Sequence, residues 1–250
     1  MMKRHIFIWI FLCTIVAAIF NACGGGNNNP TVSALSTFTF TVGSKFQYKQ
    51  WSVDSSGTSL ESTLRYVHHA VIDSGHTVAG MSGVYFIADT SIDSATNKVV
   101  AVDTLYIATS GTIVYQYGFI HRLDSSLSQG LVNPPAHWDI VATSNSPGTW
   151  ITDSTSAFTV KSIPAFELTN GINDGDTTFV INANPELSTH SILNGYIAAA
   201  GDTAYTHIDF YIGFSPAGSM RLHYAPVRII SPVGVIKYNG LERDCISFSN

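Results

Sequence analysis

The feature that most constrains the fold is a repeated alternation of apolar and polar residues. In 203–214, for example, Ile208, Phe210 and Ile212 share one face, and polar side chains occupy much of the other. A period of two is typical of β-strands with one buried face. Such segments recur about every ten residues with turn-forming residues between them, and helical periodicity is almost absent. The sequence therefore predicts an all-β, antiparallel fold in a single large domain, either a partly open barrel or a β-sandwich.

Glycine-containing turns mark the expected hairpins. A Thr-Ser-Gly turn at 109–111 and an Asn-Gly turn at 239–240 each separate two apolar strands. Asn-Gly in this setting is a strong hairpin signal, because both residues tolerate positive φ. The segment 185–200 is open to two interpretations. Its Leu and Ile residues recur at helical spacing, whereas the Asn-Gly pair at 194–195 favours another turn.

Residues 1–22 have the organisation of an export signal. Two basic residues are followed by an apolar run at 6–20. This run is shorter than the roughly 20 residues that span a bilayer, so a permanent transmembrane helix is disfavoured. The small Ala22 stands directly before Cys23, which predicts cleavage at that point and lipid attachment to the Cys23 thiol.

The segment resembles the lipobox of bacterial lipoproteins, with Ala22 and Cys23 as the matching core and departures at Phe20 and Asn21. The resemblance implies a protein held in the bacterial cell envelope by acyl chains on Cys23, which together anchor it stably. Gly24 stands where an Asp would favour retention in the inner membrane. The resemblance therefore implies the outer membrane.

The predicted organisation continues with a lipidated cysteine and flexible tether at 23–36 and an antiparallel β domain at 37–250. The tether begins with Gly and Asn residues, which bury no apolar area. Residues 121–150, rich in Pro, Ser and Trp, are expected to form a long connection between two halves of the sheet. Residues 42–48 resemble the "vGxxWxY" strand that opens some uncharacterised envelope lipoproteins. That resemblance implies a lipoprotein-carrier-like fold, an unclosed barrel around an apolar cavity.

Charge and cysteine content narrow the partners and the redox chemistry. Charged residues make up 12% of the chain, and its formal charge of −5 becomes −7 when the two basic residues of the signal are removed. This balance argues against a nucleic-acid partner, which needs a basic surface. Cys13 leaves with the signal and Cys23 carries lipid, so Cys245 is left without an internal disulfide partner and is expected to be buried and inert.

A metal site is one interpretation of the histidines. His207 and Asp209 lie on one face of a predicted strand and His223 lies on the next, and His68 or His69 could complete a transition-metal site. The simpler alternative is that each is a solvated or singly hydrogen-bonded strand residue, and this alternative is preferred. Asn-Asp-Gly-Asp at 173–176 is similarly read as a hairpin turn in preference to a calcium loop.

The aromatic residues offer candidates for ligand binding. The chain has 11 Tyr, 14 Phe and 4 Trp, and most of them must form the core. Some could instead line a groove for a lipid, glycan or apolar small molecule. The candidates for such a groove are Tyr205, Tyr211, Tyr224, Trp138 and Trp150.

No recognisable catalytic set accompanies these features, and no cofactor motif is found. We therefore expect a membrane-anchored, non-enzymatic binding or carrier module, with an apolar small molecule as a candidate ligand. Two alternatives remain open. One is a structural accessory of an envelope protein complex, and the other is a metal-dependent hydrolase that uses the histidines.

Overall fold

The computed structural model describes residues 36–119, 136–145, 147–148, 150–152, 156–160, 163–199, 202–231 and 234–249. The predicted signal peptide, Cys23 and nearly all of the tether lie outside these residues. The described residues form fifteen β-strands: β1 (Lys45–Val53), β2 (Ser59–Val78), β3 (Met81–Asp93), β4 (Val99–Ser110), β5 (Ile113–Tyr117), β6 (Trp138–Thr143), β7 (Trp150–Thr152), β8 (Ser156–Val160), β9 (Ile163–Ile181), β10 (Asn184–Ala199), β11 (Asp202–Phe214), β12 (Ala217–Tyr224), β13 (Arg228–Ser231), β14 (Gly234–Lys237) and β15 (Gly240–Ser249). None of them belongs to a helix of the length and hydrophobicity needed to cross a membrane.

All of these strands belong to one antiparallel sheet. Its order is β6-β5-β4-β3-β2-β1-β15-β12-β11-β10-β9-β7, while β13 pairs with β11 and β14, and β8 pairs with β9. The first strand, β1, pairs with the last strand, β15, in the middle of the sheet. The all-β, antiparallel prediction is confirmed, and of its two alternatives the sheet adopts the partly open barrel.

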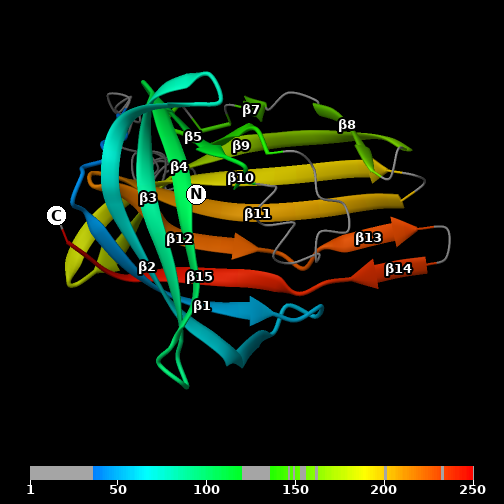
Figure 1. Cartoon of the computed structure of the whole chain (residues 1–250), viewed down its shortest axis with the longest axis horizontal. Coiled ribbons are helices and arrows are strands. Elements are labelled where there is room, and N and C mark those ends of the chain that lie inside the picture. The colour runs from blue at the N-terminus through cyan, green and yellow to red at the C-terminus, as the bar shows by residue number, and fades with distance from the viewer. Residues whose placement is uncertain are drawn as a thin grey trace, which may run out of the picture. The chain divides into compact units, whose positions relative to one another are not determined.

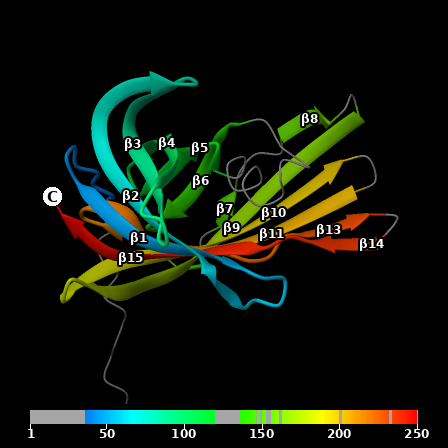
Figure 2. The ribbon, with the colours of Figure 1, turned by 60° about the horizontal axis from the view of Figure 1, so that its bottom comes forward.

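The sheet curls because its longest strands bend. β2 and β3 arch away from the plane of β9, β10 and β11 and cross them (Figures 1 and 2). The pairing of β2 with β3 shifts register around Asp73 and His76, and such bulges increase local bend and twist. As a result, β6 packs against β10 and β11 on the concave side.

Side chains fasten this contact between the two halves. Asn173 Nδ2 of β9 donates to the carbonyl oxygen of Thr143 at 2.6 Å, and Thr189 Oγ1 of β10 donates to the same oxygen at 3.2 Å. The rings of Phe119 and Phe210 meet nearby at 5.5 Å between centroids. The sheet is therefore held closed here by side-chain contacts and not by a continuous backbone ladder.

The larger hydrophobic core fills the space inside the curl. It includes Val114, Val141, Leu193, Ile208 and Tyr224, all at most 1% exposed. The segment before β1 joins this core without being a strand of the sheet. Phe38 and Phe40 are buried, Phe38 stacks on Phe214 at 4.9 Å, and the backbone of Thr39 bonds to residues 214 and 217.

A smaller core cluster lies beside the first, at the junction of β1, β2, β12 and β15. Its buried members are Phe46, Tyr48, Val67, Ile181, Met220 and Cys245. Because Phe46 and Tyr48 alternate with exposed lysines along β1, the sequence pattern alone explains their inward direction.

Two hairpin predictions meet different outcomes. The turn at 109–111 joins β4 to β5 as expected. The Asn-Gly hairpin at 239–240 is wrong, since β14 pairs with β13 whereas β15 pairs with β1 and β12. Gly240 instead lies where the backbone of Tyr224 comes too close for a side chain, because a Cβ at this position would lie 2.2 Å from the carbonyl oxygen of Tyr224.

The other glycine-containing segments are also strand and not turn. Residues 185–200 are neither a helix nor a turn, because β10 runs through 184–199 and Gly195 makes room for Thr206 Oγ1, 2.3 Å from a Cβ built there. The predicted hairpin at 173–176 is wrong in the same way. β9 continues through it with a bulge opposite His190 and Ser191, where Gly175 has a φ of +103°.

The expected long connection at 121–150 contains strand β6. Residues 138–143 alternate less clearly than other strands because three successive side chains, Val141, Ala142 and Thr143, are buried. A strand covered on both faces loses the period of two, which explains why the sequence did not indicate it. Residues 120–135 lie outside the described part of the chain.

Candidate functional site

The concave side of the sheet contains a pocket of about 290 Å³. Apolar side chains cover much of it, among them Phe40, Ile87, Leu105, Phe119, Phe210 and Leu222. Alternation along β3 and β4 places every second residue inside, so that Ile87 on β3 and its cross-strand partner Leu105 on β4 both face the pocket. The volume is near the lower end of the range of about 300–1,000 Å³ that is usual for small-molecule sites.

Polar residues of three adjacent strands form one wall of this pocket. Arg243 of β15 donates from Nε and Nη2 to Gln50 Oε1 of β1, at 2.8 and 2.5 Å. Its Nη1 lies 3.3 Å from Nε2 of His69 on β2. Since a guanidinium can only donate, a hydrogen bond between these two groups requires His69 Nε2 to be the acceptor.

Tyr48 lies under this wall and is fully buried. The guanidinium carbon of Arg243 stands 5.6 Å from the centre of its ring, and the His69 ring is 4.7 Å away. The hydroxyl of Tyr48 is buried and has no hydrogen-bond partner among the residues that the structure describes. Burial, with smaller contributions from Cys245 and Asp89, raises the pKa of Tyr48 well above its usual value, so the hydroxyl keeps its proton.

Burial also determines the protonation of His69. It lowers the pKa of this histidine below its usual 6.5, although Asp89 Oδ2 at 3.5 Å from Nε2 favours the charged form. His69 is therefore neutral at pH 7. Asp89 and Asp103 are direct cross-strand partners on β3 and β4 and both line the pocket, as does the exposed Arg65 of β2.

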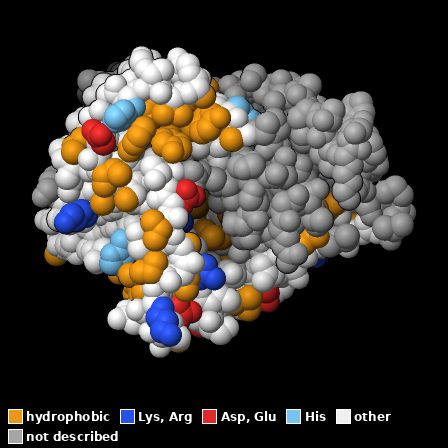
Figure 3. Space-filling view, in the orientation of Figure 1, with side chains coloured by type: hydrophobic (Ala, Val, Ile, Leu, Met, Phe, Trp, Pro, Cys, Tyr) orange, Lys and Arg blue, Asp and Glu red, His pale blue; other side chains and the backbone are white. Residues whose placement is uncertain are grey.

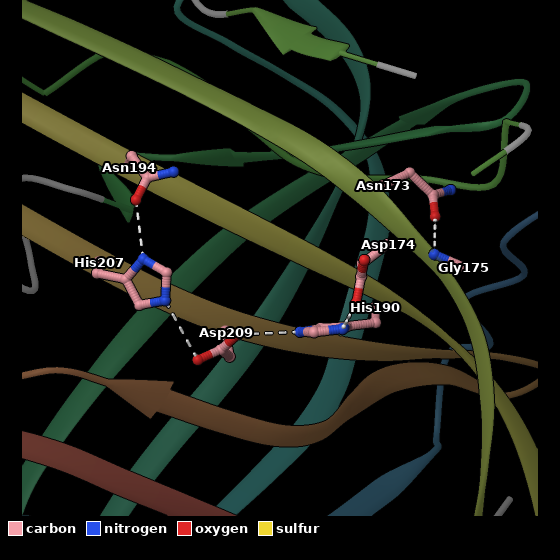
Figure 4. A network of polar contacts seen from close by, with 7 residues as sticks. All are labelled: Asn173, Asp174, Gly175, His190, Asn194, His207 and Asp209. Carbon is pink, nitrogen blue, oxygen red and sulfur yellow. Dashed lines mark hydrogen bonds and ion pairs between the residues drawn. The ribbon is translucent and has the colours of Figure 1, made fainter. Parts of the chain in front are cut away.

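A second polar network lies on the other face of β9, β10 and β11 (Figure 4). His190 stands between two carboxylates, with Nδ1 3.1 Å from Asp174 Oδ2 and Nε2 3.1 Å from Asp209 Oδ1. His207 contacts Asp209 Oδ2 at 3.5 Å and Asn194 Oδ1 at 2.8 Å. The bulge in β9 brings Asp174 within reach of His190, since Asp174 is the extra residue between the paired positions 173 and 175.

This network contains two of the three predicted metal-site residues. His207 and Asp209 are in contact, and His223 lies opposite Asp209 on β12. The residue in closest contact with Asp209 is instead His190, which stacks on Tyr211 with ring centres 4.1 Å apart. In the described part of the chain, no group of three or more His, Cys, Asp or Glu side chains is arranged to hold a metal ion.

The aromatic candidates are distributed over several surroundings. Tyr205 is 46% exposed and meets Tyr196 edge-on, Tyr211 packs on the smaller core cluster, and Tyr224 is fully buried in the larger one. Trp138 donates from Nε1 to the carbonyl oxygen of Val78 at 3.1 Å. None of these four lines the pocket. Trp150 belongs to β7, and its side chain is outside the described part.

Sequence reasoning missed the polar wall, yet the alternation contained a signal for it. Gln50 follows Phe46 and Tyr48 at spacing two, and Arg243 lies between Leu241 and Cys245 at the same spacing. Each is a polar residue at an inward position of an otherwise apolar face. A buried polar residue is more informative than a buried apolar one, because its desolvation must be compensated.

The fold and pocket define the class of this protein: an all-β protein built on one curled antiparallel sheet with a pocket that is apolar at its base and polar along one wall. No protein-family model matches the chain, and no curated protein matches it in sequence.

Two solved structures are similar to it. A candidate lipoprotein of Parabacteroides distasonis matches with a TM-score of 0.50 and 7% sequence identity, over 86% of this chain and 99% of that one. A candidate exported protein of Bacteroides fragilis, described as having a YmcC-like fold, matches with a TM-score of 0.45 and 11% identity, over 87% of this chain and 100% of that one. At 7% identity, the first match shows a shared fold.

Proposed function

We propose that this protein is a lipid-anchored, non-enzymatic binding or carrier module of the bacterial cell envelope, and that an amphipathic small molecule is its ligand. The observation that carries the proposal is the pocket of about 290 Å³ on the concave side of the sheet. An apolar base with a few convergent polar groups is the usual composition of a small-molecule site.

The size of the apolar surface suits an alkyl chain. Phe40, Phe119 and Phe210 supply flat aromatic walls, and Ile87 and Leu105 supply aliphatic ones. Each methylene group that leaves water for such surroundings contributes about 0.8 kcal/mol. Burial of a chain segment in the pocket would therefore offset part of the free-energy cost of association.

Envelope anchoring is supported by the signal and by the fold. Cys23 follows an apolar run and a small residue, as in a lipobox. The structure of similar fold from Parabacteroides distasonis is itself described as a candidate lipoprotein. We place the protein at the outer membrane, because Gly24 and not Asp follows the cysteine.

Calorimetric titration of an uncharged amphiphile, dodecyl maltoside below its micellar concentration, tests the pocket. The protein for this test is the chain from residue 23 with Cys23→Ser, which carries no lipid. Ala101→Trp, which places a large ring in the pocket lining, should weaken binding at least about tenfold. Val102→Trp is the matched control, because Val102 is the next residue of β4 and is 72% exposed. Equal affinity of both variants and the parent protein would refute the pocket as the binding site.

Labelling of cells with a radioactive fatty acid tests the anchor. Cys23→Ser in the full chain should abolish acylation and leave the protein without labelled lipid when cells are fed a radioactive fatty acid. Ser33→Ala, ten residues further along, is a control that leaves the cysteine intact. Undiminished fatty-acid labelling of Cys23→Ser would contradict the proposal.

A further inference from the structure

The charged residues of the pocket are separated by sign across the strands. Arg243 lies on β15 and Arg65 on β2, whereas Asp89 lies on β3 and Asp103 on β4. In the strand order β4-β3-β2-β1-β15, neutral His69 of β2 lies between the acidic β3–β4 side and Arg243, while Arg65 stands on β2 itself. Figure 3 shows hydrophobic, acidic and basic side chains meeting on the face that β3 and β4 cross.

On the basic side, the partners of Arg243 are uncharged. Its guanidinium contacts an amide oxygen of Gln50, the neutral imidazole of His69 and the face of the Tyr48 ring. Among the described residues, no carboxylate forms an ion pair with it. A half-buried guanidinium with neutral partners is suited to an anionic oxygen group, to which it can donate charge-assisted hydrogen bonds. The Tyr48 ring lies under the guanidinium and lines the same pocket.

On the acidic side, two carboxylates face one another. Asp89 and Asp103 are directly opposite in the β3–β4 ladder, and like charges in that arrangement repel. A cationic group near both would be attracted to them. A purely anionic ligand would instead meet these carboxylates, so the acidic side disfavours it.

We propose that the pocket binds a zwitterionic amphiphile, with its anionic group on Arg243, its cationic group beside Asp89 and Asp103, and its apolar chain on the aromatic base. The inference rests on the proposed binding function and adds the chemistry of the head group. It gives a role to Arg243, Asp89 and Asp103 together, which an uncharged or singly charged ligand would use only in part.

Four probes with the same dodecyl chain separate head-group charge from chain burial. They are dodecylphosphocholine, dodecyl phosphate, dodecyltrimethylammonium and dodecyl maltoside, each titrated below its micellar concentration into the chain from residue 23 with Cys23→Ser. The zwitterionic probe should bind about tenfold or more tightly than each of the others. Equal binding of all four overturns the head-group inference and leaves the proposed function standing. If none of the four probes binds, the proposed function itself is refuted.

Single substitutions should then change the charge preference in opposite directions. Arg243→Gln should weaken dodecylphosphocholine about tenfold to a hundredfold and remove its advantage over the cationic probe. Asp103 is exposed, so Asp103→Asn should fold normally. This variant should bind dodecylphosphocholine no more tightly than dodecyl phosphate. Arg228→Gln and Glu61→Gln, both exposed and outside the pocket, control for loss of one charge of each sign. An unchanged order of the four probes in both pocket variants overturns the proposal.

Discussion

Tyr48→Phe should stabilise the protein, although it removes a polar group from a fully buried residue. The Tyr48 hydroxyl has no hydrogen-bond partner within the described part of the chain, and leaving such a group buried costs about 1 to 3 kcal/mol. Phenylalanine keeps the ring under Arg243 and against His69, so both ring contacts remain. We therefore expect the free energy of unfolding to rise by about 1 kcal/mol or more.

Urea unfolding of the ligand-free chain, followed by far-ultraviolet circular dichroism, measures this change. The midpoint should increase while the m-value stays constant, because the same surface is exposed on unfolding. In thermal unfolding, each kcal/mol corresponds to roughly 2–4 °C for a chain of this size. Tyr106→Phe, at a half-buried tyrosine of β4, is the control and should change stability by less than about 0.5 kcal/mol.

A loss of about 1 kcal/mol or more in the ligand-free Tyr48→Phe protein would refute the reasoning, since it would mean that the hydroxyl is bonded in the folded state, for example to an ordered water.

Three further predictions test the buried groups and the close contacts. Burial lowers the pKa of His69 from 6.5, so the unfolded chain binds a proton at this histidine before the folded chain does as the pH falls. The contribution of neutral His69 to stability is therefore complete above about pH 6.5 and is lost below it. The free energy of unfolding should change by at most about 1.4 kcal/mol per pH unit from this group. Urea unfolding between pH 7 and pH 5 should show a shallower dependence in His69→Gln, and identical slopes would contradict the assignment. Gly240→Ala should lower the free energy of unfolding by about 3 kcal/mol or more in the same assay, because the added Cβ meets the backbone of Tyr224. Gly195→Ala should cost less, because its Cβ meets only the Thr206 hydroxyl, which can rotate. The reverse order would show that the β12–β15 contact is looser than described. Burial raises the pKa of the Cys245 thiol to about 12. At pH 8 this thiol should therefore react with a disulfide reagent about a thousandfold more slowly in the folded chain than in the unfolded chain. Rapid labelling of the folded protein would refute the burial of Cys245.

The alternation of residues predicted the class of fold because it depends only on local geometry. Successive side chains of a strand point to opposite faces, so a sheet with one buried face leaves a readable pattern in β1 and β11. The hairpin at 109–111 was predictable for the same reason, since its two strands are neighbours in sequence and in space.

Glycines were the main source of error, because one residue type serves two purposes. Gly111 lies in a turn, whereas Gly195 and Gly240 lie where another chain segment approaches too closely for a Cβ. The approaching groups, Thr206 and the carbonyl of Tyr224, come from other strands. Sequence alone does not tell these uses apart, because the distinction depends on tertiary contacts.

The pocket is the place where local pattern and fold disagree, and that disagreement has a physical meaning. Gln50, His69 and Arg243 occupy inward positions at which an apolar residue would satisfy both the strand pattern and the core. Their cost is visible in the lowered pKa of His69 and in the partnerless Tyr48 hydroxyl beside them. A sequence selected for stability alone would replace these residues, since buried polar groups that are only partly satisfied are worse than an apolar core. Their presence together on one wall of a single pocket is what the proposed ligand would explain, because its polar groups would meet polar side chains there.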